Sequence, residues 1–318
     1  MTNIMYKYTS TQIHTKQLNN PNNPNNLPIT MGDTRATEVI DAERVFYTSS
    51  DIIREYKFVE EIASGGFSNV WRAYNKKTNK TVAIKISKNV KEGNSSLLNE
   101  YAVMNKLDNE YLMKGISFYH GTTNSHLVLP YYPGDLFSFI QDNELLSEDS
   151  IRVILHDVGI AIRHMHNRDL VHRDIKPENV MVADGGKFIL TDFGNTEHEN
   201  NMTFSKLRGT TSFFAPEIIK GFRRKEEVLF TLGKPIDMYA LGMTLYILAT
   251  KASAAPQFNN IKNLFRWVEN PDALQEVDRI SNRSENLKDL LRKLLDVNPV
   301  SRMTIGELFQ HPFMNIKK

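Results

Sequence analysis

Four short motifs gather residue types that suit phosphate and divalent metal chemistry. They are HRDIKPEN at His172–Asn179, DFG at Asp192–Gly194, APE at Ala215–Glu217 and VAIK at Val82–Lys85. Carboxylate and amide oxygens are the hard ligands that Mg²⁺ prefers. Lysine ammonium groups neutralise phosphate, and a carboxylate can accept the proton of a hydroxyl. These motifs can act together only if the fold brings distant parts of the chain to one place.

The first elements that would position them are strands. Tyr56–Ile62, Val70–Tyr74 and Thr81–Ile86 are short β-branched or aromatic runs separated by turn residues, which predicts an antiparallel meander. The apolar spacing of Ser95–Leu107 is typical of a helix, and His126–Leu129 reads as another strand. A small β-rich half is therefore expected first.

The second half is expected to be mainly helical. Ser147–Met165 has a helical apolar face behind an N-cap at Ser147, and Ile236–Thr250 is apolar enough to be a buried helix. Leu287–Leu295 is amphipathic, and Thr304–Gln310 has a cap at Thr304. The two halves predict two lobes with a cleft between them.

In this order and these contexts, the four motifs resemble the eukaryotic-type protein kinase family, serine/threonine branch. The resemblance covers Tyr56 to Phe313. It implies an α+β, bilobal protein-kinase fold: a small antiparallel β-sheet N-lobe with an αC helix, and a larger, mainly helical C-lobe. The expected lobes are residues 51–132 and 133–318.

Residues 1–50 differ from the rest in composition. Asn19–Pro28 reads NNPNNPNNLP and offers almost nothing to bury, so this segment is expected to be a flexible Asn/Pro-rich N-terminal extension. A docking or targeting segment is the alternative.

The resemblance assigns four catalytic roles. Lys85 would hold the α- and β-phosphates of ATP, with Glu100 in the αC helix as its carboxylate partner. Asp174 would accept or orient the proton of the attacking hydroxyl, and Lys176 would steady the transferring phosphate. A lysine at position 176 resembles the serine/threonine branch. We therefore expect protein substrates with serine or threonine acceptors.

The resemblance also implies a metal site. Asn179 and Asp192 supply oxygen ligands for Mg²⁺, or for Mn²⁺ in its place. ATP and the metal ion are the expected cofactors.

The glycine-rich loop departs from the family pattern. Ala63 and Ser68 stand where the first and third glycines are expected, and only the middle glycine, Gly65, remains. Weakened or altered ATP contact is expected, since glycine lets backbone N–H groups approach phosphate closely; a plain hairpin turn is the alternative. The loop residues expected to bind nucleotide are Ala63, Ser64, Gly65, Gly66, Phe67, Ser68 and Val70.

The adenosine site is also read from the resemblance. Val70 and Ala83 would cover one face of adenine with Met181 beneath it, and Leu129 would be the gatekeeper. The remaining contacts would come from the hinge at Tyr131 and from Asp135 at the ribose. Core packing could explain the same residue types.

Further motifs favour a protein as the phosphate acceptor. Thr210 is expected to bond to Asp174 and Lys176. Glu217 is expected to pair with Arg302, and Asp237 to brace the catalytic loop. These features argue against a kinase for small molecules, which generally lacks the APE and following helix pattern.

Regulation by loop phosphorylation is a hypothesis. Arg173, beside the catalytic aspartate, often pairs with a phosphate on the activation loop in this family. Glu197 and His198 stand where a second basic ligand often sits, so only a weak phosphate pocket is expected. The available hydroxyls are Thr203, Ser205 and Thr211.

Composition sets the remaining limits. The net charge of +2 gives no reason to expect binding to nucleic acid or a membrane surface, and no apolar run is long enough for a membrane span. Zero cysteines are compatible with a reducing, cytoplasmic location, or with a host cell if the source is a parasite, bacterium or virus. The oligomeric state stays open. A pseudokinase scaffold is the main functional alternative, although Lys85, Asp174, Asn179 and Asp192 are all intact.

Overall fold

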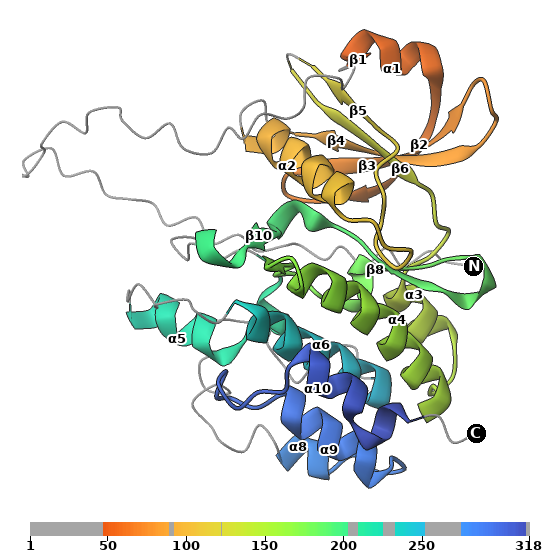
Figure 1. Cartoon of the computed structure of the whole chain (residues 1–318). Helices are drawn as coiled ribbons and strands as arrows, with labels where there is room; N and C mark the ends of the chain where they lie inside the picture. Colours follow the sequence, from red (N-terminus) through yellow and green to blue (C-terminus); the bar gives the residue numbers. More distant parts are fainter. Residues whose placement is uncertain are drawn as a thin grey trace, which may run out of the picture.

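The computed structural model describes residues 47–88, 92–121, 123–202, 209–224, 233–251 and 275–315. These residues form a sheet-based lobe and a helical lobe, as the resemblance implies (Figure 1). The smaller lobe has one six-stranded sheet in the order β1-β5-β6-β4-β3-β2. Its strands are β1 (Tyr47–Thr48), β2 (Tyr56–Ser64), β3 (Ser68–Asn75), β4 (Thr81–Ser87), β5 (Ser117–His120) and β6 (His126–Pro130). Its helices are α1 (Ser49–Glu55) and α2 (Glu92–Lys106).

The predicted meander is confirmed by strands β2, β3 and β4, which pair antiparallel in sequence order. Strand β6 returns beside β4, so that Ala83 lies opposite Leu129, while Val70 on β3 lies opposite Lys85. Alternation along β3 and β4 therefore brings apolar residues and Lys85 to the same part of the sheet.

The ordered lobe begins inside the segment that was expected to be a flexible extension. Tyr47 on β1 pairs in parallel with Tyr119 on β5, and α1 follows at once. Ile52 of α1 is only 1% exposed, and the Tyr119 hydroxyl donates to Glu55 at 2.9 Å. Buried apolar contact and hydrogen bonds, this one among them, hold the short helix against the sheet. Residues 1–46 lie outside the described residues.

The larger lobe is built around α4 and α6. Its helices are α3 (Leu136–Asp142), α4 (Glu148–His166), α5 (Pro216–Arg224), α6 (Lys234–Thr250), α8 (Gln275–Asp278), α9 (Glu285–Leu294) and α10 (Ile305–Gln310). Four short strands are β7 (Leu170–Val171), β8 (Val180–Val182), β9 (Phe188–Leu190) and β10 (Glu197–His198). Most of α6 is buried, and the predicted caps at Ser147 and Thr304 are both formed. Among the described residues, five short 3-10 turns lie between β7 and α5, and one follows α10.

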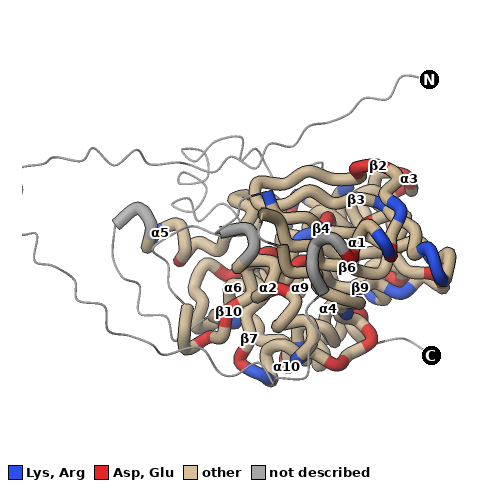
Figure 2. Tube along the Cα trace, turned by 90° about the horizontal axis from the view of Figure 1, so that it is seen from above, with Lys and Arg blue, Asp and Glu red and all other residues tan. Residues whose placement is uncertain are grey.

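Acidic and basic residues are interspersed along the described chain (Figure 2). This mixture agrees with a formal net charge of +2 from 39 basic and 37 acidic residues. None of the helices in the described ranges has the length and apolar character that crossing a bilayer would require.

Candidate active site

The antiparallel pair of β8 and β9 brings the HRD and DFG motifs together. The segment 172–179 joins β7 to β8, and Asp192 follows β9. Because β8 and β9 pair antiparallel, the residues at their outer ends meet: the Thr191 N–H donates to the Asn179 carbonyl at 2.9 Å. The local pairing thus sets Asn179 and Asp192 next to each other.

Lys85 connects the two lobes. Its Nζ lies 3.1 and 2.8 Å from the two carboxylate oxygens of Glu100, and 2.8 Å from Oδ1 of Asp192. The side chain of Glu100 is 1% exposed, whereas that of Asp192 is 37% exposed. The juxtaposition of Lys85 with Glu100 agrees with the expected pair. The contact with Asp192 was not anticipated.

One ammonium group shared by two carboxylates makes their pKa values diverge. Burial raises the pKa of Glu100 to about 7, although the charge of Lys85 opposes that rise. Burial would also raise the pKa of Asp192, but attraction to Lys85 outweighs it and lowers the pKa to about 2. Burial alone would lower the pKa of Lys85, yet Asp192 and Glu100 together raise it. The Asp192 carboxylate is therefore ionised and the Lys85 ammonium charged at neutral pH.

Asp174 is held by three neighbours. Its Oδ1 accepts the Thr210 backbone N–H at 2.9 Å, and its Oδ2 lies 3.2 Å from both Lys176 Nζ and Asn179 Nδ2. Lys176 Nζ also donates to the Thr210 hydroxyl at 2.6 Å. Both expected contacts of Thr210 are present. They join the segment 172–179, which is the catalytic segment in the family resemblance, to the residues that precede the APE motif.

The donor set fits a hard divalent cation. Asn179 uses its Nδ2 to bond to the carbonyl and carboxylate of Asp174, at 2.8 and 3.2 Å, which leaves its Oδ1 as the atom that a metal ion would use. Asp192 has a left-handed backbone with φ of 64° and is ionised. A carboxylate and an amide oxygen are ligands that suit Mg²⁺.

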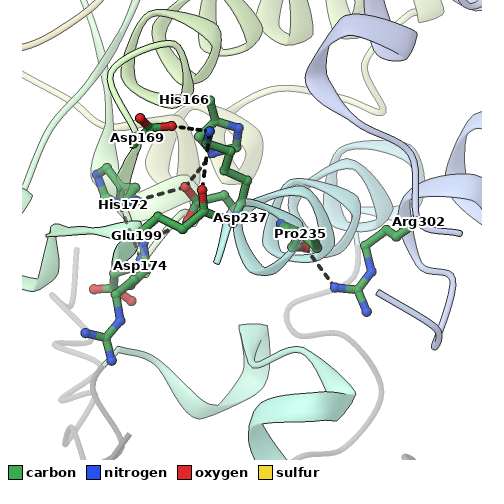
Figure 3. Close-up of polar contacts among 10 residues, drawn as sticks. His166, Asp169, His172, Asp174, Glu199, Pro235, Asp237 and Arg302 are labelled. Carbon is green, nitrogen blue, oxygen red and sulfur yellow. Dashed lines mark hydrogen bonds and ion pairs between the residues drawn. The ribbon is translucent and has the colours of Figure 1, made fainter. Parts of the chain in front are cut away.

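The Asp237 carboxylate lies against the start of the segment 172–179 (Figure 3). The residue is fully buried on α6, and its carboxylate accepts the backbone N–H groups of His172 and Arg173, each at 2.8 Å. His166 Nε2 lies 2.9 Å from the same carboxylate. These bonds hold a strained point, because Arg173 has a φ of 69°. The expected bracing role of Asp237 agrees with this geometry.

His172 and Phe193 are positioning residues that our reasoning from sequence did not single out. His172 Nδ1 accepts the Asp174 N–H at 3.2 Å, so its proton lies on Nε2, which donates to the Thr191 carbonyl at 3.0 Å. The rings of His172 and Phe193 pack edge to face at 5.5 Å, and both residues are fully buried. Their positions within the HRD and DFG motifs were the available signal.

The residues expected at the adenosine are contributed by both lobes. Val70, Ala83 and Leu129 come from β3, β4 and β6, Tyr131 follows β6, and Met181 lies on β8. Asp135 has a further contact: its Oδ1 caps α3 by accepting the Ser138 N–H at 2.7 Å. Its expected contact with the ribose stays a prediction.

The loop between β2 and β3 makes a tight turn. The Gly65 N–H donates to the Ser68 carbonyl at 2.8 Å, and the Phe67 side chain is 45% exposed at the tip. This turn joins Ala63 to Val70, which lie opposite each other on β2 and β3.

The expected pair between Glu217 and Arg302 is present and bidentate, at 2.6 and 2.8 Å. Arg302 also donates to the Pro235 carbonyl at 2.8 Å (Figure 3) and lies over the Tyr239 ring. The pair fixes the APE motif to the base of the larger lobe.

Comparison with known proteins agrees with this geometry. A family model described as "Protein kinase domain" matches residues 56–314. Serine/threonine-protein kinase TIO of Arabidopsis thaliana is 27% identical over 271 residues, which cover 82% of this chain and 19% of that protein. Serine/threonine-protein kinase RAD53 of Saccharomyces cerevisiae is 27% identical over 294 residues, 86% of this chain and 35% of the relative.

A mouse relative is more similar in sequence. Serine/threonine-protein kinase DCLK3 of Mus musculus is 30% identical over 281 residues, 84% of this chain and 34% of the relative. The chain therefore spans well under half the length of these three relatives.

Proposed function

This chain belongs to the protein kinase family, and we propose that it is an active kinase that transfers the γ-phosphate of ATP to serine and threonine hydroxyls of protein substrates. The observation that carries the proposal is the joining of two clusters. One contains Lys85, Glu100 and Asp192, the other Asp174, Lys176 and Thr210, and Asn179 bonds to Asp174 beside Asp192.

The first cluster would hold ATP. The Lys85 ammonium neutralises phosphate charge, and its bonds to Glu100 and Asp192 fix its position before nucleotide arrives. Mg²⁺ held by Asp192 and Asn179 would neutralise and align the phosphates. Binding energy is spent on alignment because phosphoryl transfer needs little covalent help from the protein.

The second cluster would act on the acceptor. As the hydroxyl oxygen forms its bond to the γ-phosphorus, the bond between that phosphorus and the bridging oxygen of ADP breaks, and Asp174 accepts the hydroxyl proton. Lys176, held between Asp174 and Thr210, counters the charge on the transferring group. Thr210 ties this arrangement to the segment before the APE motif, which supports a protein acceptor.

Transfer of radiolabel from [γ-³²P]ATP to a generic basic protein tests the proposal, with Asp174→Asn as the matched control. We expect labelled serine and threonine with the natural chain and a near-complete loss with the variant. A peptide array would then define the preferred sequence around the acceptor. Stabilisation by MgATP without any transfer would instead support a pseudokinase scaffold, the reading that the altered glycine loop favours.

A further inference from the structure

Lys88 reaches across the sheet to the loop between β2 and β3. It follows directly after β4, and its backbone N–H donates to the Phe67 carbonyl at 2.8 Å. Its Nζ donates to the Ser64 hydroxyl at 2.8 Å and to the Gly65 carbonyl at 2.7 Å. Lys88 thus contacts Ser64 at the end of β2 and the loop residues Gly65 and Phe67.

Lys88 approaches the loop from the side of the sheet opposite Lys85. Its Nζ bonds to Ser64, which lies opposite Asn69, and Asn69 lies opposite Ile86, the neighbour of Lys85 that points to the other face of the sheet. Ser64 lies opposite Asn69, and its hydroxyl donates to Asn69 at 3.1 Å. Asn69 precedes Val70 and therefore also points away from the face of Val70.

The bond to the Gly65 carbonyl has a consequence for the next peptide N–H. In a trans peptide the C=O of one residue and the N–H of the following residue point in opposite directions. Because Lys88 holds the Gly65 carbonyl on the outer side, the N–H of the same peptide, on Gly66, points toward the face that carries Lys85. A backbone N–H at that place is the donor that a phosphate-binding loop requires.

We propose that Lys88 is a positioning residue that holds the Gly65–Gly66 peptide with its N–H toward the phosphates of ATP. The proposal rests on nucleotide binding by the proposed function. It bears on the loop's departure from the family pattern: Ala63 and Ser68 carry side chains where two glycines are expected, so the Gly65–Gly66 peptide is where a backbone N–H can approach phosphate without a Cβ in the way. The ammonium donates hydrogen bonds stronger than those of a neutral group.

The test compares the affinities of the natural chain for MgATP and for adenosine, by isothermal titration calorimetry, with those of Lys88→Met. We expect the variant to bind MgATP about three- to tenfold more weakly, as the loss of a charged donor to a partly solvated acceptor implies. Adenosine lacks phosphates, so its affinity should stay within about twofold. Kinetically, the KM for ATP should rise while kcat changes little.

Two further variants sharpen the result. Lys88→Arg keeps the charge and the donors and should restore most of the MgATP affinity. Lys80→Met removes an exposed lysine at the opposite end of the β3–β4 hairpin and should change neither affinity. Ser64→Ala removes only one of the two acceptors and should have a smaller effect than Lys88→Met.

Two outcomes would overturn the role of Lys88: unchanged MgATP affinity in Lys88→Met, or an equal loss of MgATP and adenosine affinity. If the natural chain binds MgATP but transfers no phosphate, the proposed catalytic function fails, while the affinity comparison still decides the role of Lys88.

Discussion

Glu197 forms an ion pair with the guanidinium of Arg173, the residue that precedes Asp174. The Arg173 side chain is 3% exposed and that of Glu197 is 22% exposed. Arg173 was expected to meet a phosphate on the activation loop, with Glu197 as a complication. In the structure Glu197 itself supplies a carboxylate to that cation, next to the strand pairing of β10 with β7.

Replacing Glu197 by glutamine should destabilise the fold, because a buried guanidinium loses its counter-charge. We expect the free energy of unfolding to fall by about 1–3 kcal/mol, less than for a fully buried pair because Glu197 is partly exposed. Urea denaturation measures the change. Glu285→Gln is the control, since Glu285 is 77% exposed in its pair with Lys288 and should contribute little. Equal effects of the two changes would contradict the importance of the Arg173 pair.

The same ion pair predicts activity without loop phosphorylation. Thr203 and Ser205 lie outside the described residues, and Thr211 begins a short 3-10 turn. Since a carboxylate already faces Arg173, we expect phosphatase treatment to leave kcat within about twofold, an energy difference below 0.5 kcal/mol. Mass spectrometry would verify that all three hydroxyls are unmodified. A large loss of kcat after dephosphorylation would contradict this prediction and show that activity depends on loop phosphorylation.

Lys85→Met should abolish most of the catalytic activity while the chain still folds. The loss of the phosphate-binding cation is expected to lower kcat by at least about 10³-fold. Glu100 then lies in an apolar site without its cation, but it can take up a proton, which limits the loss of stability. Steady-state kinetics and circular dichroism measure the two effects. Lys187→Met, which removes the exposed partner of Glu110, is the control, and turnover near the natural value in Lys85→Met would refute the role of Lys85.

Stability should depend on pH through Glu100. Its pKa rises from 4.5 to about 7 on folding, so between these values the folded chain keeps a proton that the unfolded chain releases. The free energy of unfolding therefore falls as pH rises through this window, by up to about 3 kcal/mol. Asp192 does not disturb this window. Its pKa is lowered from 3.8 to about 2, so its contribution to stability grows between these pH values and is constant above them.

Glu100→Gln cannot ionise, which makes it the comparison for this prediction. Urea denaturation of the metal-free proteins at several pH values from 4.5 to 7 should show a shallower decline for the variant. Parallel profiles for the two proteins would mean that Glu100 does not titrate in this range.

Local patterns predicted much of the fold and site. The strands of the meander and the caps at Ser147 and Thr304 depend on neighbours in sequence, so spacing and side-chain type were sufficient. The Lys85–Glu100 and Glu217–Arg302 pairs are distant in sequence, and only the family resemblance suggested them.

Other features depend on contacts that no local pattern carries. Strand β1 is two residues long and exists through its pairing with β5, which is itself too short to show a period. The contacts of Lys88 with the loop and of Glu197 with Arg173 arise only once the sheet and the catalytic segment are folded. Asp135 is an exception, because an aspartate three residues before Ser138 is a readable capping signal.

Asp237→Asn tests whether the bonds from Asp237 to the segment 172–179 position Asp174. The carboxylate accepts N–H groups from His172, Arg173 and His166, whereas an asparagine has one acceptor oxygen and would turn an NH₂ group toward a buried donor. We expect the free energy of unfolding to fall by about 2–4 kcal/mol. We also expect kcat to fall, because the left-handed backbone at Arg173 loses the bonds that hold it.

Asp278→Asn is the matched control, because the Asp278 side chain is 60% exposed and pairs with Arg292, which is 34% exposed, at the surface of the larger lobe. It should change stability by less than about 1 kcal/mol and leave kcat alone. Adenosine affinity distinguishes positioning from general damage: it should persist in folded Asp237→Asn while kcat falls, because the proposed adenosine contacts come from the sheet and from Met181 rather than from the peptide at position 173. If Asp237→Asn kept the natural kcat, the bonds from α6 would be structural only, and the alignment of Asp174 would have to come from Thr210 and Lys176 alone.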